Sequence, residues 1–289
     1  MRRLIINADD FGLTSGVNRG ILQAYSNGIV NSSTLMASGP QFDEAVSLAA
    51  GAPGLSVGCH VLLVDGSPIS PVNQVASLLQ KSAPRFRDSL AQFALLASAG
   101  RLDGSQIEAE ITAQIQKLQS AGIQVSHLDS HKHTHMFPVV FKAMIRAAKK
   151  CGVRALRNPF EPLIFAKNRH WKRSFQLGLL RSYRASFRKA LAESDLVTPD
   201  GCIGIVATGG LTSEIFRTLI ENLPEGTWEF VSHPGYCDDA LNQTATRLKA
   251  SREQELAILT SAETIGVLRR AGVVTLSYRE FAESSPANT

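Results

Sequence analysis

The chain has 289 residues, of which 44% are apolar and 19% are charged. It is therefore long and apolar enough to bury a sizeable core, which excludes a disordered protein. Thirty Lys and Arg residues against 25 Asp and Glu residues give a formal charge of +5, an excess that suggests an anionic partner such as nucleic acid or a membrane surface.

Short β-branched runs alternate with helical patterns along most of the chain. In chain order we expect strands at 4–7, 30–36, 55–63, 123–128, 153–156, 203–207, 228–232 and 273–277. Helices are expected at 16–25, 42–50, 86–97, 107–120 and 139–150, with further helices between the later strands. Strands that are usually followed by a helix are typical of parallel βαβ units. At this length the pattern predicts an α/β fold, a closed or partly closed (β/α) barrel rather than an open doubly wound sheet.

No internal repeat or low-complexity linker divides the chain. We therefore predict a single domain over residues 1–283, followed by a tail over 284–289. The glycine signatures that bind phosphates in nucleotide-binding folds are absent from the sequence.

Cysteine usage and hydropathy indicate a soluble, cytoplasmic protein. The four cysteines stand singly, without the spacing of a zinc site or the density of a disulfide framework. The N-terminal residues lack the apolar stretch of a signal peptide, and no apolar run approaches the roughly 20 residues that span a bilayer. We therefore expect at most a peripheral contact with the inner face of the membrane.

Acidic and histidine residues fall at or just past the ends of predicted strands. Asp9 and Asp10 follow the first strand, and His60 lies toward the end of the third. The segment 129–135 follows the fourth strand, and His233 follows the seventh. Because the carboxyl ends of parallel strands converge on one face, these four segments should deliver acids and imidazoles to one rim.

A histidine cluster makes this rim a candidate metal site. Residues 126–135 (SHLDSHKHTH) hold four of the seven histidines of the chain. A carboxylate with two imidazoles suits Zn²⁺ or another first-row divalent ion and leaves positions open for water and substrate. If Asp10, His60 and one histidine of the cluster are the ligands, Asp9 stands beside them where a general base is needed.

Other interpretations of the same residues remain open. An acid pair after a strand can cap the next helix, and a lone strand histidine is often a buried, hydrogen-bonded core residue. Strand alternation puts His127 and Asp129 on one side, and His131, His133 and His135 continue that side if the chain stays extended. Not all four histidines can be ligands, so some must orient the ligands or contact substrate.

The chain resembles the YdjC-like carbohydrate deacetylases, which include chitooligosaccharide deacetylases. The resemblance is carried by residues 6–13 (INADDFGL), 58–60 (GCH) and 127–138 (HLDSHKHTHMFP), and it extends to 154–157 (RALR) and 232–234 (SHP). It covers the chain from near residue 3 to near residue 280.

The resemblance implies a barrel-like fold of the glycoside hydrolase/deacetylase type and one divalent metal ion, Zn or Mg, with Mn, Co and Ni as alternatives. It also implies roles for five residues: Asp10, His60 and His131 as metal ligands, Asp9 as catalytic base and His233 as general acid. The implied reaction is hydrolysis of an N-acetyl group to acetate and a free amino sugar.

Three further residues are candidates for contact with substrate. Arg157, at the end of a strand, either contacts substrate or forms a surface salt bridge. Asp129 either contacts substrate or holds a histidine in its working tautomer. His133 is the third candidate.

A basic, aromatic-rich insert is predicted at about 160–195. The stretch 167–189 has eight Lys or Arg residues and no acidic residue, so the remaining 22 basic residues of the chain face 25 acidic ones. Aromatic and leucine residues recur there every four positions, which predicts a basic amphipathic helix or helix pair: Trp171, Phe175, Leu179, Tyr183 and Phe187.

This insert has two interpretations. It is either a barrel helix with a solvated basic face, or an apolar lid or membrane-surface helix in which Trp171 and Phe175 contact substrate. Single-stranded nucleic acid is not expected as a partner, because no recognition module accompanies the basic residues.

Within the family, the chain most resembles the hopanoid-biosynthesis-associated (HpnK-type) branch. This implies deacetylation of an N-acetylglucosaminyl lipid, an acetylglucosaminyl hopanoid, at a membrane surface. The alternatives are a soluble chito-oligosaccharide as substrate, a non-catalytic carbohydrate- or lipid-binding protein, and another metal hydrolase such as a phosphoesterase. A homodimer is one assembly compatible with the sequence.

Overall fold

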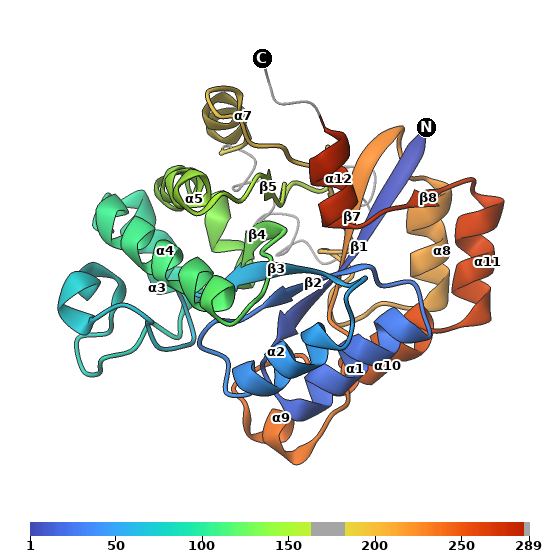
Figure 1. Cartoon of the computed structure of the whole chain (residues 1–289), viewed down its shortest axis with the longest axis horizontal. Coiled ribbons are helices and arrows are strands. Elements are labelled where there is room, and N and C mark those ends of the chain that lie inside the picture. Colours follow the sequence, from blue (N-terminus) through green and yellow to red (C-terminus); the bar gives the residue numbers. More distant parts are fainter. Residues whose placement is uncertain (163–182, 286–289) are drawn as a thin grey trace.

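The computed structural model of the chain describes residues 1–162 and 183–285. A parallel sheet forms its centre (Figure 1), with strands in the order β5-β4-β3-β2-β1-β7-β6 and β8 paired to β1. The strands are β1 (Arg2–Phe11), β2 (Ser32–Leu35), β3 (Ser56–Val61), β4 (His127–Ser130), β5 (Ala155–Leu156), β6 (Gly201–Ile203), β7 (Gly226–Ser232) and β8 (Val274–Thr275).

Helices surround the strands, as Figure 1 shows, with α1, α2 and α10 along one side, α8 and α11 along another, and α4 and α5 along a third. The α-helices are α1 (Ser15–Ser26), α2 (Phe42–Ala50), α3 (Leu90–Ser98), α4 (Gly104–Ser120), α5 (Pro138–Cys151), α7 (Arg184–Ala192), α8 (Ser213–Glu221), α9 (Asp239–Gln243), α10 (Ala250–Leu259), α11 (Ala262–Arg270) and α12 (Tyr278–Ser284). Short 3₁₀ segments are η1 (Val72–Gln74), η2 (Ala76–Leu78) and η3 (His131–Met136).

The sheet forms a partly closed barrel, which confirms the predicted fold class. β5 and β6 end the path of strands, and hydrogen bonds of Val197 and Phe160 join the chain across the gap between them. The Leu156 N–H donates to the Val197 carbonyl, and the Val197 N–H donates to the Arg154 carbonyl. The Cys202 N–H donates to the Phe160 carbonyl. The barrel is therefore joined at this seam by isolated hydrogen bonds rather than by a continuous ladder of strand pairing.

The two faces of β1 have different neighbours, because side chains alternate along a strand. Leu4 and Ile6 belong to the main apolar core. Ile5 instead packs with Tyr278 and Phe281 of α12. Since the Tyr278 N–H donates to the side chain of Ser32 at the start of β2, α12 lies at the amino end of the sheet. The opposite, carboxyl end is left for the candidate site.

Several predicted boundaries moved for local reasons. The strand expected at 123–128 begins at His127, because the Ile123 N–H donates to the Leu118 carbonyl and so closes α4. The helix expected at 86–97 begins at Leu90, since the Ser89 side chain caps it. The strand expected at 4–7 runs on to Phe11, so the acid pair lies within the strand and not past it.

The predicted basic insert is described only in part. Trp171 and Phe175 lie outside the described residues. In α7, Phe187 is buried and stacks on Phe141 of α5, with ring centroids 3.9 Å apart. Within the described residues, α7 therefore packs as a barrel helix. Also within the described residues, no helix is long and apolar enough to cross a membrane.

Candidate active site

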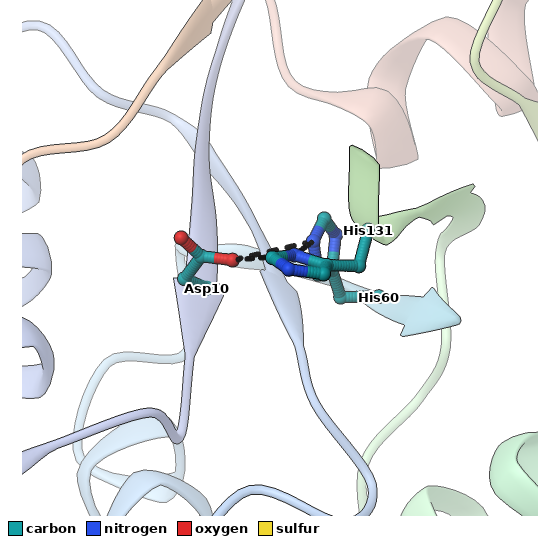
Figure 2. A group of neighbouring side chains, drawn as sticks. All are labelled: Asp10, His60 and His131. Atoms are coloured by element: carbon teal, nitrogen blue, oxygen red, sulfur yellow. Dashed lines mark hydrogen bonds and ion pairs between the residues drawn. The ribbon is translucent and has the colours of Figure 1, made fainter. Parts of the chain in front are cut away.

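Three side chains converge at the carboxyl end of the sheet: Asp10 from β1, His60 from β3 and His131 from the start of η3 (Figure 2). Each residue offers one possible metal-ligand atom, and these three atoms all lie within 4.8 Å of one another. Asp10 Oδ1 is 3.4 Å from His60 Nε2 and 3.3 Å from His131 Nδ1. The two imidazole nitrogens are 3.4 Å apart. The structure thus brings together the three residues that the resemblance implied as ligands.

Two backbone irregularities make this convergence feasible. Adjacent residues of a regular strand point to opposite faces, so Asp9 and Asp10 could not both reach the site. The register of β1 against β2 shifts between Ala8 and Phe11, and Asp10 has φ of 70°. Such a bulge with a left-handed residue redirects a side chain, and it is common next to active sites.

The histidines after β4 do not continue the alternation of the strand, because the chain does not stay extended. Lys132 and His133 have φ of 53° and 54°, so the chain turns into η3 directly after His131. His135 is buried beneath this turn, with its Nδ1 2.6 Å from the Ser130 hydroxyl. His133 is half-buried, and burial lowers its pKa to about 3. His131 is therefore the histidine of this segment that meets Asp10.

Asp129 holds His60 from behind. Asp129 is fully buried, and its Oδ1 lies 2.8 Å from His60 Nδ1. A carboxylate can only accept, so Nδ1 donates and Nε2 is left facing Asp10. The Thr34 hydroxyl donates to the other Asp129 oxygen. Although burial lowers it, the carboxylates of Asp129 and Asp10 raise the pKa of His60 to about 10. Of the two roles considered for Asp129, its position thus fits the one in which it holds a histidine.

Arg157 binds Asp9 at the centre of the barrel. Its side chain is fully buried, so the alternative of a surface salt bridge is wrong. Its two terminal nitrogens lie 2.9 and 2.7 Å from the two oxygens of Asp9. They also lie 2.6 Å from Asp129 and 2.6 Å from Glu229. Burial raises the pKa of Asp9, but Arg157 outweighs burial and holds it below its usual range, so Asp9 is ionised.

His233 follows β7 and faces the same acid. Its Nε2 is 3.9 Å from Asp9 Oδ2, and 11% of its side chain is exposed. The backbone N–H of His233 donates to the carboxylate of Glu255 in α10 at 2.6 Å. Burial lowers the pKa of His233, and the charge of Glu255 opposes this. The expected base and the expected acid therefore lie side by side, next to Asp10, His60 and His131, which we call the ligand group.

Comparison with known proteins identifies the family. Residues 3–270 match the model of a family described as YdjC-like protein. The chain belongs to the YdjC-like family. It is 34% identical to the carbohydrate deacetylase of Geobacillus stearothermophilus over 97% of this chain and 98% of that protein. It is 30% identical to the carbohydrate deacetylase of Thermoanaerobacter pseudethanolicus, over 96% and 98%.

A solved structure shows the same fold. It is an Enterococcus faecalis V583 protein whose name proposes cellobiose-phosphate cleavage. The TM-score is 0.79 at 26% sequence identity, and the match covers 97% of this chain and 98% of that one. This likeness supports the barrel architecture of the YdjC-like chain over nearly its whole length.

Two buried residues of α10 were not foreseen as part of the site of this YdjC-like chain. Arg252 Nη2 lies 2.5 Å from Asp10 Oδ2, and Glu255 binds the His233 backbone. A sequence signal existed, because Arg252, Glu255 and Leu259 recur at the i, i+3, i+7 spacing of a core-facing helix stripe. Charged residues on such a stripe need buried partners.

Glu229 was missed for a similar reason. It stands inside the apolar strand β7, where it accepts from Arg157 and from the hydroxyl of Tyr278. Its neighbours Trp228 and Phe230 belong to the main core, so alternation turns Glu229 toward the barrel interior. A lone acid between two aromatic residues was the signal that could have found it.

The site opens to solvent beside His131. The side chain of His131 is 21% exposed and that of Lys132 is 36% exposed, whereas Asp10 and His60 are nearly completely buried. Asp65 lies at this rim, with its Oδ2 3.5 Å from His131 Nε2. Asp65 also pairs with Lys132. Of the residues around Asp10, those on the η3 side are therefore the most exposed to solvent.

Proposed function

We propose that this protein is a metal-dependent carbohydrate N-deacetylase that acts on an N-acetylglucosamine unit of a glycolipid. The observation that carries the proposal is the convergence of Asp10, His60 and His131 beside Asp9 and His233. The names of the relatives at 30% and 34% identity support the class of reaction.

The ligand group fits a divalent cation. Asp10 Oδ1 is buried, has no hydrogen-bond partner within residues 1–162 and 183–285, and faces two imidazole nitrogens. Arg252 occupies the other oxygen of Asp10, so one oxygen is free for a cation. One carboxylate and two imidazoles suit Zn²⁺ and other first-row divalent ions, with Mg²⁺ as an alternative. Bound there, the ion supplies polarisation of the acetyl carbonyl and acidification of water.

The protein's own residues move the protons. Asp9 is ionised and has both oxygens fixed by Arg157, so it can accept the proton of the attacking water without reorienting. His233 supplies a proton to the nitrogen of the departing sugar amine as the C–N bond breaks. The short separation of Asp9 and His233 lets both groups act on one tetrahedral carbon.

The glycolipid part of the proposal is supported by the sequence of residues 167–189, which is rich in Lys, Arg and aromatic residues. Such a composition suits a lipid surface. A soluble chito-oligosaccharide is the alternative substrate, and it requires no contact with lipid.

Acetate release tests the reaction. We expect the metal-loaded protein to release acetate from an N-acetylglucosaminyl substrate, to lose this activity with a chelator and to regain it with Zn²⁺ or Mg²⁺. Asp9→Asn should retain the metal but lose about 10²- to 10⁴-fold in kcat, because the general base is gone. Full activity after chelation, or normal turnover by Asp9→Asn, would contradict the proposed mechanism.

A second comparison tests the substrate. Acetate release from a lipid-linked N-acetylglucosamine should exceed release from chitobiose at equal sugar concentration. A strong preference for chitobiose would favour the soluble alternative and leave the deacetylase activity itself intact.

A further inference from the structure

Glu255 of α10 lies behind His233, on the side of the ring away from Asp9. One carboxylate oxygen of Glu255 accepts from the His233 backbone N–H at 2.6 Å. The same oxygen is 3.9 Å from His233 Nδ1, while Nε2 on the other side of the ring is 3.9 Å from Asp9. The imidazole is therefore placed between two carboxylates, with one nitrogen toward each.

Two polar atoms of this residue pair have no hydrogen-bond partner among the residues that the structure describes. They are Nδ1 of His233 and Oε1 of Glu255, and both are buried. A buried polar atom without a partner is destabilising, so a small movement that brings Nδ1 and the Glu255 carboxylate together is favoured. The terminal torsion of a glutamate is broad, and catalytic hydrogen bonds often tighten only when substrate binds. Glu255 and Nδ1 can therefore meet without a change in the backbone.

The other charges around His233 are accounted for. Arg252, one turn earlier on α10, pairs with Asp10 at 2.5 Å. Asp9 is bound by both terminal nitrogens of Arg157. Glu255 Oε2, which accepts from the His233 backbone N–H, is also the oxygen that faces Nδ1 of His233. Burial lowers the pKa of His233, and Glu255, Asp9 and Asp10 oppose that effect while Arg252 adds to it.

We infer that Glu255 is a positioning residue for the reaction. Its carboxylate accepts a hydrogen bond from the Nδ1–H of His233 and so keeps Nε2 turned toward the substrate. The inference rests on the proposed function, in which His233 is the general acid. The protonated ring gives its Nε2 proton to the amine nitrogen as the C–N bond breaks, and it keeps its Nδ1 proton, which stays hydrogen-bonded to the Glu255 carboxylate. Asp9 has meanwhile taken one proton from the attacking water, so amide and water yield acetic acid and amine, and the proton on Asp9 returns to His233 before the next turnover.

Glu255→Gln tests this inference, with Glu253→Gln as the matched control. Glutamine at 255 can still accept from the His233 backbone but carries no charge. Glu253 is exposed on the same helix and also accepts from a backbone N–H, that of Cys237 at 3.0 Å. We expect Glu255→Gln to lower kcat about 10- to 100-fold, with KM and metal content unchanged. Glu253→Gln should behave like the wild type, and an equal loss in both variants would overturn the inference.

The pH profile and a double-mutant cycle separate positioning from a merely structural role. Loss of the Glu255 charge should lower the pKa of His233, so the descending limb of kcat/KM should move to lower pH. Glu255→Gln should change little when introduced into His233→Asn, because a residue that acts through His233 has nothing left to act on. An equal loss in both backgrounds would overturn the inference.

Nitrogen-15 NMR of the His233 ring provides a test that needs no activity and no variant. The neutral ring should carry its proton on Nδ1, and a proton on Nε2 would overturn the inference. If the wild type released no acetate from any N-acetylated sugar, the proposed function would fail, whereas the NMR result would still report on the contact between Glu255 and His233.

Discussion

Single residues of this barrel each serve several partners, and Arg157 is the plainest case. Its guanidinium contacts Asp9 of β1, Asp129 of β4 and Glu229 of β7, and none of its side chain is exposed. Asp129 in turn holds His60, so the proposed base and a proposed ligand share one buried cation. A buried charge of this kind is tolerated because its partners satisfy it, and removing it leaves the partners uncompensated.

Replacing this arginine should therefore be costly. We expect Arg157→Met to lower the free energy of unfolding by about 3–5 kcal/mol, measured by urea denaturation, because three buried carboxylates lose their cation. Arg85→Met is the matched control, since Arg85 forms an exposed pair with Asp88 and such pairs contribute about 0–1 kcal/mol. Equal unfolding midpoints for the two variants would contradict the structural role assigned to Arg157.

At the scale of elements, the sequence predicted which segments form strands and helices but not the irregular backbone that completes the site. Asp9 and Asp10 could be recognised as a pair after a strand core. The register shift that turns both toward the site depends on pairing with β2, which no local pattern encodes. The turn at Lys132 was likewise hidden, because a lysine carries no left-handed preference.

Contacts between distant segments were also out of reach. The stripe of α10 predicted a buried face for Arg252, but nothing near it in sequence indicated Asp10 as its partner. The segment after β4 contained enough histidines to indicate a metal site, but its local pattern left open which of them is the ligand. The resemblance implied His131, and the structure places His131 against Asp10. Local composition thus predicted the chemistry, while tertiary pairing selected the residues.

The packing of α7 leads to a prediction about the basic insert. Phe187 is 3% exposed and lies against Phe141 and Phe160. We expect Phe187→Ala to lower the free energy of unfolding by about 3–5 kcal/mol, because it opens a cavity beneath the helix. Arg188→Ala, on the exposed side of the same helix, should change it by less than about 0.5 kcal/mol. A negligible effect of Phe187→Ala would instead favour a helix that is free to leave the barrel.

At the scale of the whole molecule, the barrel interior holds more negative than positive charge. In the described part of the chain, the buried carboxylates around the site outnumber the buried cations, which are the guanidinium groups of Arg157 and Arg252 and the imidazole of His60. The carboxylates are Asp9, Asp10, Asp129, Glu229 and Glu255. A divalent cation in the ligand group would offset this imbalance, so the folded state should gain stability from it.

Thermal unfolding measures that gain. At a free metal concentration of 100 times its dissociation constant, we expect a stabilisation of about 2.7 kcal/mol and a higher Tm, and a chelator should reverse it. His131→Ala removes a ligand from the exposed rim and should abolish most of the shift. A Tm that does not respond to Zn²⁺ or Mg²⁺ in the wild type would contradict the cation site.

The position of β1 in the sheet has a consequence for how the protein is made. Arg2 pairs with Gly226 and Ala8 pairs with Ser232, so one edge of β1 stays unpaired until β7 has been synthesised. At about 5–20 residues per second, that wait is roughly ten seconds or more on the ribosome. Such distant parallel pairing also folds slowly. We therefore expect β1, the strand that carries both acids of the site, to keep an unpaired edge during most of the synthesis of the chain.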